Sequence, residues 1–334
     1  MNINLIYNSN LFIEGISKYS NDLFNNLFKR NFNPNLIKLK KLEFNVGNKK
    51  IGGWASKEFF SKFIILNRTD VNHSTDHWSL SNYSNVVTIH DIIPYYFSEF
   101  YRLNKSTIYF YDKMISKLNN VNYFIVPSRR VYDTLIEKFE NIFSNKVINI
   151  IPRGIENLPY SIINPYKNNG KIHLITIGDF NKRKRFDLLY DYVNGLKDVE
   201  LYHIGKISDY DAYHKAMKNN NSNVKYLGYI ADSNLMYSYL QYADKFVFNT
   251  LDEGQGMPSL EALKLGTQPL VNDIAVHREI LGDMPYYYNN KDEFIELIYK
   301  SNKDSKILSH YVRKYDNWID NHIKVYDGIW NQLN

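Results

Sequence analysis

Residues 246–263 read FVFNTLDEGQGMPSLEAL, a short apolar run, a glycine-containing turn and an amphipathic stretch. The run 246–248 predicts a buried strand, and Pro258 suits the first turn of a helix that follows it. Gly254 and Gly256 allow the tight turn between the two elements. A strand that feeds a helix in this way is the repeating unit of parallel α/β sheets.

The same alternation of apolar runs and amphipathic stretches extends to both sides of this segment. It predicts two α/β domains in series, joined by a polar, Pro- and Asn-containing linker near 152–170. We expect an N-terminal domain at 1–160, a second domain at 161–312, and a C-terminal helix at 313–334 that crosses back to the first. The region after Pro285 has a mostly helical pattern, and its aromatic residues are expected to pack in a core. The predicted strands are 4–7, 86–89, 123–126, 147–151, 174–177, 200–204, 224–227, 246–248 and 268–271.

Composition narrows the class of protein. The chain has 334 residues, 44% hydrophobic and 23% charged, which favours a two-domain globular protein over a disordered one. No run of 18 apolar residues and no basic start before a long apolar stretch occurs, so we expect a cytoplasmic protein. It has no cysteine and nine histidines without metal-ligand spacing, so no structural metal is expected.

The strongest chemical signal is the helix start that follows Glu253. A helix N-terminus attracts phosphate through its unpaired N–H groups and its dipole, so a diphosphate fits here. Glu261 lies about one helical turn further on, within reach of a hydroxyl beside that diphosphate. The alternative is a capped helix whose acidic residues only complement its dipole. The candidate ligand-binding residues of the segment are Gly254, Gln255, Gly256, Met257, Pro258, Ser259, Leu260 and Glu261.

Two further strand ends carry candidate residues. The stretch 178–185 reads GDFNKRKR, and four consecutive cations beside a glycine could hold phosphates or form an ordinary solvated loop. His90 ends the apolar strand 86–89, at the edge of a parallel sheet where ligands bind. A structural histidine with its hydrogen bonds satisfied is the alternative there.

At these residues the sequence resembles the retaining glycosyltransferases of family 4, which have the GT-B architecture of two Rossmann-like domains facing across a cleft. The family's E-G-F-G-L-P-x-x-E-A-M segment resembles 253–263, with two acids eight residues apart. The resemblance extends over most of the chain. The other matching segments are GISKY at 15–19, HDIIP at 90–94, VPS at 126–128, IPRGI at 151–155, YLGY at 226–229 and EILGD at 279–283.

The resemblance implies roles for single residues. Arg183 and Lys184 would hold the donor diphosphate, Glu261 the ribose hydroxyls, and Glu253 the hydroxyls of the transferred sugar. His90 would contact that sugar from the other domain, Gly15 would let the first loop approach the phosphates, and Tyr229 would belong to the donor site. The implied reaction is retaining transfer of a hexose from a GDP- or UDP-linked donor to a glycan, lipid-linked or other acceptor. Members of the family generally need no metal, and no cofactor is expected.

Two positions depart from the family pattern. Gln255 stands where the family usually has Phe, which removes a packing contact. Asp179 follows Gly178 where many members have Arg or Ser. A carboxylate near phosphates is unfavourable unless it points away or pairs with Arg183.

Two other classes of function stay open at this point. A nucleotide-sugar epimerase shares the GT-B architecture, and a module that binds anionic polymers would suit the charge of the first half. Residues 1–165 contain 20 Lys and Arg against 13 Asp and Glu, a net charge of +7. No specific nucleic-acid binding is expected. Cations interleaved with aromatic residues in 18–68 favour an acceptor at an anionic membrane surface, or else a lysine-biased solvated face.

Overall fold

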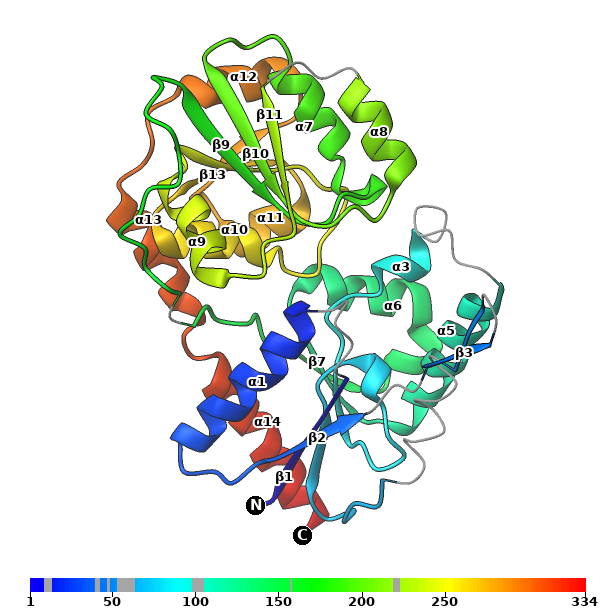
Figure 1. Ribbon diagram of the computed structural model, residues 1–334. Helices are drawn as coiled ribbons and strands as arrows, with labels where there is room; N and C mark the ends of the chain where they lie inside the picture. The colour runs from blue at the N-terminus through cyan, green and yellow to red at the C-terminus, as the bar shows by residue number, and fades with distance from the viewer. Residues whose placement is uncertain are drawn as a thin grey trace. The chain divides into compact units, whose positions relative to one another are not determined.

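A computed structural model describes residues 1–8, 14–39, 43–46, 49–52, 64–97, 105–156, 158–218 and 223–334. The chain divides into two compact units (Figure 1): unit 1 comprises Met1–Arg153 with Asn317–Asn334, and unit 2 comprises Gly154–Asp316. Each unit contains a six-stranded sheet in which every neighbouring pair of strands is parallel. The predicted two-part α/β architecture is therefore confirmed. The chain passes from one unit to the other after Arg153 and again after Asp316, whereas the predicted boundaries are at 160 and 312.

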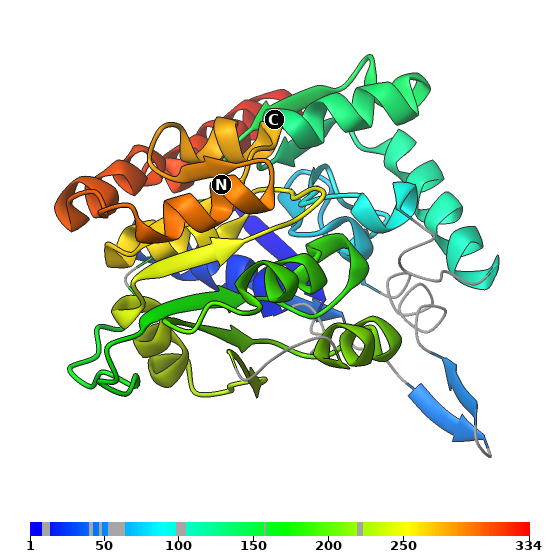
Figure 2. The same ribbon diagram turned by 90° about the horizontal axis from the view of Figure 1, so that it is seen from above.

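Unit 1 has the sheet order β2-β1-β5-β6-β7-β8. The order reverses between β1 and β5. A separate antiparallel hairpin, β3 (Glu43–Val46) with β4 (Lys49–Gly52), is visible as two adjacent blue arrows in Figure 2. The remaining elements of unit 1 are β1 (Ile3–Asn8), α1 (Glu14–Lys29), β2 (Asn35–Leu39), β5 (Val71–Ser74), η1 (His77–Ser79), β6 (Val86–Thr88), α3 (Ile93–Tyr96), α5 (Lys105–Lys117), η2 (Leu118–Asn120), β7 (Tyr123–Val126), α6 (Arg129–Phe143), β8 (Val147–Ile150) and α14 (Trp318–Leu333).

Strand β5 lies in the middle of this sheet, yet it reads Val-Asn-His-Ser and all four residues are buried. Hydrogen bonds satisfy its polar side chains: Asn72 Oδ1 accepts from Asn4 Nδ2 at 2.8 Å, and the Ser74 hydroxyl donates to the Ser79 carbonyl at 3.0 Å. A buried polar group is tolerated when it is hydrogen-bonded. Strand β5 is not among the predicted strands because its sequence is not an apolar run. The edge strand β2 is not among them either.

Unit 2 has the sheet order β11-β10-β9-β12-β13-β14, which in order of appearance is 3-2-1-4-5-6. This is the strand order of a dinucleotide-binding Rossmann fold, with its reversal between β9 and β12. Its elements are β9 (Ile172–Ile177), η3 (Lys182–Lys184), α7 (Phe186–Val193), β10 (Val199–Ile204), α8 (Tyr210–Lys218), β11 (Val224–Gly228), α9 (Ser233–Tyr242), β12 (Lys245–Phe248), α10 (Met257–Leu265), β13 (Gln268–Asn272), α11 (Ala275–Leu281), β14 (Tyr286–Tyr288), α12 (Lys291–Tyr299), α13 (Ser305–Tyr311) and η4 (Val312–Tyr315).

The C-terminal region differs from its expected, mostly helical form at its start. It begins with a strand, β14, which pairs with β13 directly after Pro285. The aromatic residues of this region pack in hydrophobic cores, as expected: Tyr315 belongs to the core of unit 2, whereas Trp318 and Tyr326 pack in unit 1 with Leu5 and Tyr19. Figure 1 shows α14 alongside α1, and the two helices are in contact. Helix α14 thus completes the core of the first unit.

Candidate active site

The topology of unit 2 brings the two strongest sequence motifs together. The order of its sheet reverses between β9 and β12, and parallel sheets bind ligands at the carboxyl ends of the strands beside such a reversal. The loop after β9 carries Arg183 and Lys184, and the loop after β12 carries Glu253. Because β9 and β12 are neighbouring strands, these loops leave the sheet side by side.

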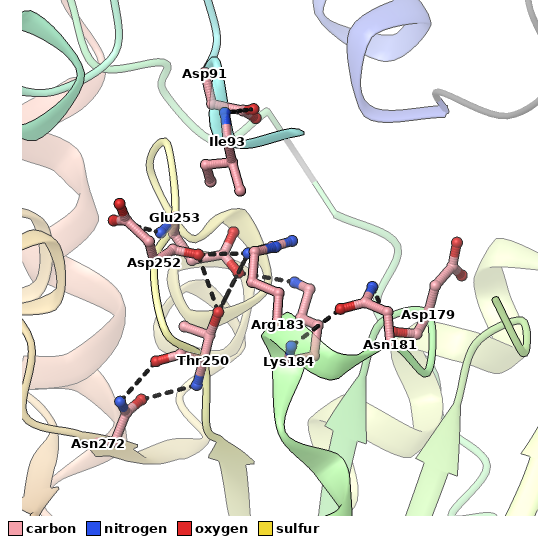
Figure 3. A network of polar contacts seen from close by, with 10 residues as sticks. All are labelled: Asp91, Ile93, Asp179, Asn181, Arg183, Lys184, Thr250, Asp252, Glu253 and Asn272. Atoms are coloured by element: carbon pink, nitrogen blue, oxygen red, sulfur yellow. Dashed lines mark hydrogen bonds and ion pairs between the residues drawn. The ribbon is translucent and has the colours of Figure 1, made fainter. Parts of the chain in front are cut away.

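Glu253, Arg183 and Lys184 form one ionic cluster, in which each side chain is 11% exposed (Figure 3). Lys184 Nζ lies 3.0 Å from Glu253 Oε1, and Arg183 Nη1 donates to the same oxygen. The cluster therefore holds two cations and one carboxylate. It carries a net positive charge in a largely desolvated place, where electrostatic interactions are strong.

A polar chain fixes the carboxylate from the neighbouring strand. The Thr250 hydroxyl lies 3.1 Å from Glu253 Oε1, and Arg183 Nη1 donates to that hydroxyl at 3.2 Å. Asn272, the last residue of β13, holds Thr250 by its backbone: Asn272 Oδ1 accepts from the Thr250 N–H at 3.1 Å, and Asn272 Nδ2 donates to the Thr250 carbonyl at 2.8 Å. Figure 3 shows the chain Asn272–Thr250–Glu253.

The charges of this cluster follow from their surroundings. Burial alone would raise the pKa of Glu253, but Arg183 and Lys184 lower it to about 2. Burial lowers the pKa of Lys184, and the attraction of Glu253 opposes that shift. Glu253 is thus a carboxylate at physiological pH and can only accept hydrogen bonds. Such a group suits the hydroxyls of a sugar.

Asp179 adopts one of the two acceptable orientations. Its Oδ1 accepts a hydrogen bond from the Lys206 N–H at 3.0 Å, and Figure 3 shows its carboxylate pointing away from Arg183 and Lys184. Asn181 Oδ1 accepts from the Lys184 N–H at 3.0 Å and begins η3. The left-handed residue Arg185 (φ 47°) then turns the chain into α7. These local contacts direct the two cations toward Glu253.

Helix α10 begins where the glycine turn was expected. Gly256 has φ 76°, a left-handed conformation that favours glycine, and Pro258 lies in the first turn. His277 of α11 packs close beneath Gly256. Its Nδ1 lies 2.9 Å from the Asn272 carbonyl and therefore carries the proton, whereas its buried Nε2 has no partner among the described residues.

The other predicted residues of the helix differ in their access to a ligand. Gly254, Gln255 and Gly256 are buried, whereas Met257 and Pro258 are partly exposed. Leu260 has no exposed surface and belongs to the hydrophobic core, so its side chain supports the helix from within. The Ser259 hydroxyl is also buried and has no partner among the described residues.

Glu261 and Tyr229 lie near the carboxyl edge of the same sheet. Glu261 is partly exposed and accepts a hydrogen bond from the Tyr237 hydroxyl of α9 at 2.8 Å. Tyr229 follows β11 directly and is 47% exposed, with Lys206 Nζ 4.1 Å from the centre of its ring. The structure therefore supplies Tyr237 as a partner of Glu261, which the sequence did not indicate.

In unit 1, His90 follows β6, and its Nε2 lies 2.9 Å from the Thr75 carbonyl at the end of β5. A carbonyl only accepts, so Nε2 carries the proton. Burial lowers the pKa of His90 to about 4, and the imidazole is neutral at pH 7. Gly15 is an exposed residue in the first turn of α1, where its carbonyl accepts from Arg153 Nη1 at 3.3 Å. Thr75 and Arg153 had not been identified from sequence.

Neither metal ligands nor a membrane-spanning segment stands out in the part of the chain that the structure describes. No three His, Asp or Glu side chains gather there as a metal site would require. No helix within the described ranges is both long and apolar enough to cross a bilayer. The basic and aromatic region expected at a membrane lies largely outside the described residues, including Lys40, Lys41, Trp54, Lys57 and Lys62.

Comparison with solved structures supports the fold class. Sucrose-phosphate synthase from Thermosynechococcus elongatus superimposes with a TM-score of 0.71 over 99% of this chain and 100% of that chain, at 13% sequence identity. The pneumococcal O-GlcNAc transferase GtfA, solved with UDP and GlcNAc, gives a TM-score of 0.59 over 86% of this chain and 62% of that chain, at 15% identity. The chain thus has the fold of the GT-B glycosyltransferases.

Sequence comparison also finds similarity to glycosyltransferases, mainly in the second half of the chain. Residues 162–321 match the family described as glycosyl transferases group 1. O-antigen chain mannosyltransferase B of Escherichia coli is 27% identical over 120 residues, which are 36% of this chain. The aligned segment spans only 29% of the length of that relative.

Proposed function

We propose that this protein is a retaining glycosyltransferase that transfers a hexose from a GDP- or UDP-linked donor to a hydroxyl of a glycan or lipid-linked acceptor. The single observation that carries the proposal is the cluster of Arg183, Lys184 and Glu253 beside the start of α10. It combines two cations for a diphosphate with one permanently ionised acceptor for sugar hydroxyls.

The donor would bind along the carboxyl edge of the second sheet. The two cations and the α10 N-terminus attract the diphosphate, and Glu261 accepts from the ribose hydroxyls. Glu253 accepts from hydroxyls of the transferred sugar, and His90 is proposed as a further contact of that sugar. Negative charge develops on the diphosphate as it leaves the sugar, and fixed cations beside it stabilise that charge most effectively.

In the reaction, the bond between the anomeric carbon and the β-phosphate oxygen breaks, and its electron pair goes to the phosphate. The acceptor oxygen bonds to the anomeric carbon on the same face, and the departing phosphate oxygen takes the acceptor's proton. We propose that no metal is required, because Arg183, Lys184 and the helix dipole provide the positive charge. This leaves Glu253 to support an oxocarbenium-like sugar rather than to act as a strong base.

The direct test is to titrate the full chain with a panel of nucleoside diphosphates and nucleotide-sugars and to record thermal stabilisation. A true donor raises the melting temperature because it binds only the folded protein. At a ligand concentration of one hundred times Kd, this binding adds about 2.7 kcal/mol to the free energy of unfolding. Products are then analysed with and without acceptors. Conversion of the donor sugar without any acceptor would instead assign an epimerase, and steeply salt-dependent polymer binding without nucleotide binding would assign an anion-binding module.

The acceptor is proposed to be anionic or carried by a lipid, from the net charge of +7 in residues 1–165. Flotation of the full chain with anionic and neutral vesicles at low and moderate salt tests this point. Binding to anionic vesicles that weakens with salt supports a membrane-linked acceptor. Equal, negligible binding to both kinds of vesicle would favour a soluble acceptor.

A further inference from the structure

The core of unit 1 contains a continuous chain of polar side chains that the proposed function does not use. Its members are fully or almost fully buried and come from α1, β5, β6 and α14. Three of its links join Tyr19 to His322 at 2.7 Å, Tyr19 to Thr88 at 3.0 Å, and Thr88 to His73 Nε2 at 2.8 Å. A fourth joins His73 Nδ1 to the Tyr326 hydroxyl at 2.6 Å.

His322, at one end of this hydrogen-bond network, determines where the protons of the network lie. His322 Nδ1 is 2.7 Å from the Trp318 carbonyl, which can only accept, so this nitrogen carries a proton. Burial lowers the pKa of His322 to about 4, and the ring is therefore neutral at pH 7. Its Nε2 is then a bare acceptor. Hence the Tyr19 hydroxyl must donate to His322.

The remaining links follow from that assignment. Tyr19 has only one hydroxyl proton, so Thr88 must donate to the Tyr19 oxygen. The Thr88 oxygen then accepts from His73 Nε2–H, and this leaves His73 Nδ1 to accept from Tyr326. Every member is satisfied and every bond points the same way, from Tyr326 on α14 through β5, β6 and α1 back to His322 on α14. Such a fully satisfied buried network fixes its members in one arrangement.

Tyr19 brings this hydrogen-bond network into contact with His90. The ring centres of Tyr19 and His90 are 4.7 Å apart and their planes are inclined at 83°, an edge-on contact. On its other side, His90 Nε2–H donates to the Thr75 carbonyl. The neutral ring then presents Nδ1 as its acceptor nitrogen, and Nδ1 has no hydrogen-bond partner among the described residues. The titratable groups that interact electrostatically with His90 are Arg153, His322, His73 and His77.

We propose that Tyr19 is a positioning residue for His90, the proposed contact of the transferred sugar, and that α14 fixes Tyr19 through His322. This inference rests on the proposed function. It makes the last helix of the chain a part of the catalytic arrangement and not only a packing element. The Tyr19 hydroxyl is hydrogen-bonded to both Thr88 and His322, and these two bonds keep its ring from rotating away from His90.

The first experiment compares Tyr19→Phe, His322→Phe and His322→Gln in the full chain. Tyr19→Phe and His322→Phe keep the size of the side chain but break the hydrogen-bond network. Each should lower kcat about tenfold, because His90 is then misplaced. His322→Gln should recover part of the loss, since its amide oxygen can accept from Tyr19. The affinity for nucleoside diphosphate should stay unchanged, because its proposed site lies in unit 2.

Tyr166→Phe is the matched control. Tyr166 is a buried tyrosine of unit 2 whose hydroxyl donates to the Tyr239 carbonyl at 2.6 Å. This control should show a similar loss of melting temperature and an unchanged kcat. The double variant Tyr19→Phe/His322→Phe should be no worse than either single variant, because the same link is broken. Equal kcat for Tyr19→Phe, Tyr166→Phe and the unaltered protein would overturn the positioning role.

The second experiment does not depend on activity. Nitrogen-15 shifts of selectively labelled histidine report which ring nitrogen of His90 carries the proton, with His90→Asn providing the assignment. We expect the Nε2–H form in the unaltered protein and a mixture of both forms in Tyr19→Phe. An Nδ1–H form in the unaltered protein would overturn the inference. If no donor supports transfer, the proposed function fails, and this measurement still decides the arrangement of His90.

Discussion

Lys184 Nζ lies 3.0 Å from Glu253 Oε1, although the two residues follow different strands of the second sheet. Arg183 donates to the same carboxylate oxygen. The two cations proposed to hold the diphosphate are thus already partly neutralised by the acid proposed to hold the sugar. A diphosphate must compete with Glu253 for these cations, which has a direct consequence for mutation.

Replacing Glu253 with Gln should therefore separate donor binding from transfer. We expect transfer to fall by about 100-fold or more, because a charged acceptor at the reacting sugar is lost. The affinity for nucleoside diphosphate should stay the same or rise several-fold, because Arg183 and Lys184 lose their competing carboxylate. Initial rates and titration calorimetry measure the two effects.

Glu200→Gln provides the control for that variant. Glu200 is an ion-paired carboxylate at the opposite, amino edge of the same sheet, 3.3 Å from Lys171. It should leave both transfer and nucleotide affinity unchanged. Turnover near that of the unaltered protein in folded Glu253→Gln would remove Glu253 from the mechanism.

Thr250→Val should reduce transfer about tenfold, since it removes the hydroxyl between Arg183 and Glu253 with little change of shape. Thr176→Val on β9 is the matched substitution. The Thr176 hydroxyl is buried without a partner among the described residues, so its removal should leave transfer unchanged and stability equal or higher. Steady-state kinetics and thermal melts of the two variants test the difference. Equal rates for both would show that the Thr250 hydroxyl does not support catalysis.

Acidification should destabilise the fold below about pH 6.5. Burial lowers the pKa of His322 and of His203 to about 4, so the unfolded chain binds more protons than the folded one below the usual histidine pKa of 6.5. The two histidines do not affect the free energy of unfolding above pH 6.5. As the pH falls toward 4, each lowers the free energy of unfolding by up to about 1.4 kcal/mol per pH unit. Denaturant unfolding between pH 7 and pH 4.5 measures the slope.

The stabilising effect of Glu253 has the opposite sign and a different window. Its pKa is lowered to about 2, so its contribution is complete above the usual glutamate pKa and is lost only as the pH falls toward 2. The slope between pH 6.5 and 4.5 should therefore persist in Glu253→Gln and become shallower in His322→Gln. A stability that does not change over this interval would contradict the buried neutral histidines.

Transfer should continue in the presence of a chelator. We expect rates with excess EDTA to lie within about twofold of those with Mg²⁺ or Mn²⁺, because fixed cations and a helix N-terminus act on the leaving diphosphate. Arg183→Ala should lower the rate far more than the chelator does. Strict dependence on an added divalent ion would refute the metal-free proposal.

Local sequence patterns determined the two-part α/β fold and most of its strands. Alternating apolar runs and amphipathic stretches are short-range features, so they could be recognised at 174–177, 200–204 and 246–248 without knowledge of their neighbours. The same holds for the turn at Gly256, because a left-handed glycine before Pro258 is a local requirement. The strands β5 and β14 escaped prediction. In β5 the polar side chains are buried by partners that are distant in the sequence.

Only the tertiary structure decided which polar groups meet. Thr250 and Asn272 are 22 residues apart, and Tyr19 and His322 are 303 residues apart, so no sequence spacing could connect them. Sequence alone left the orientation of Asp179 open, and the Lys206 N–H determines it. A side chain's rotamer and charge depend on the strand order and on the atoms that surround it. Periodicity along the chain specifies which residues are apolar, whereas the folded sheet brings the reacting groups together.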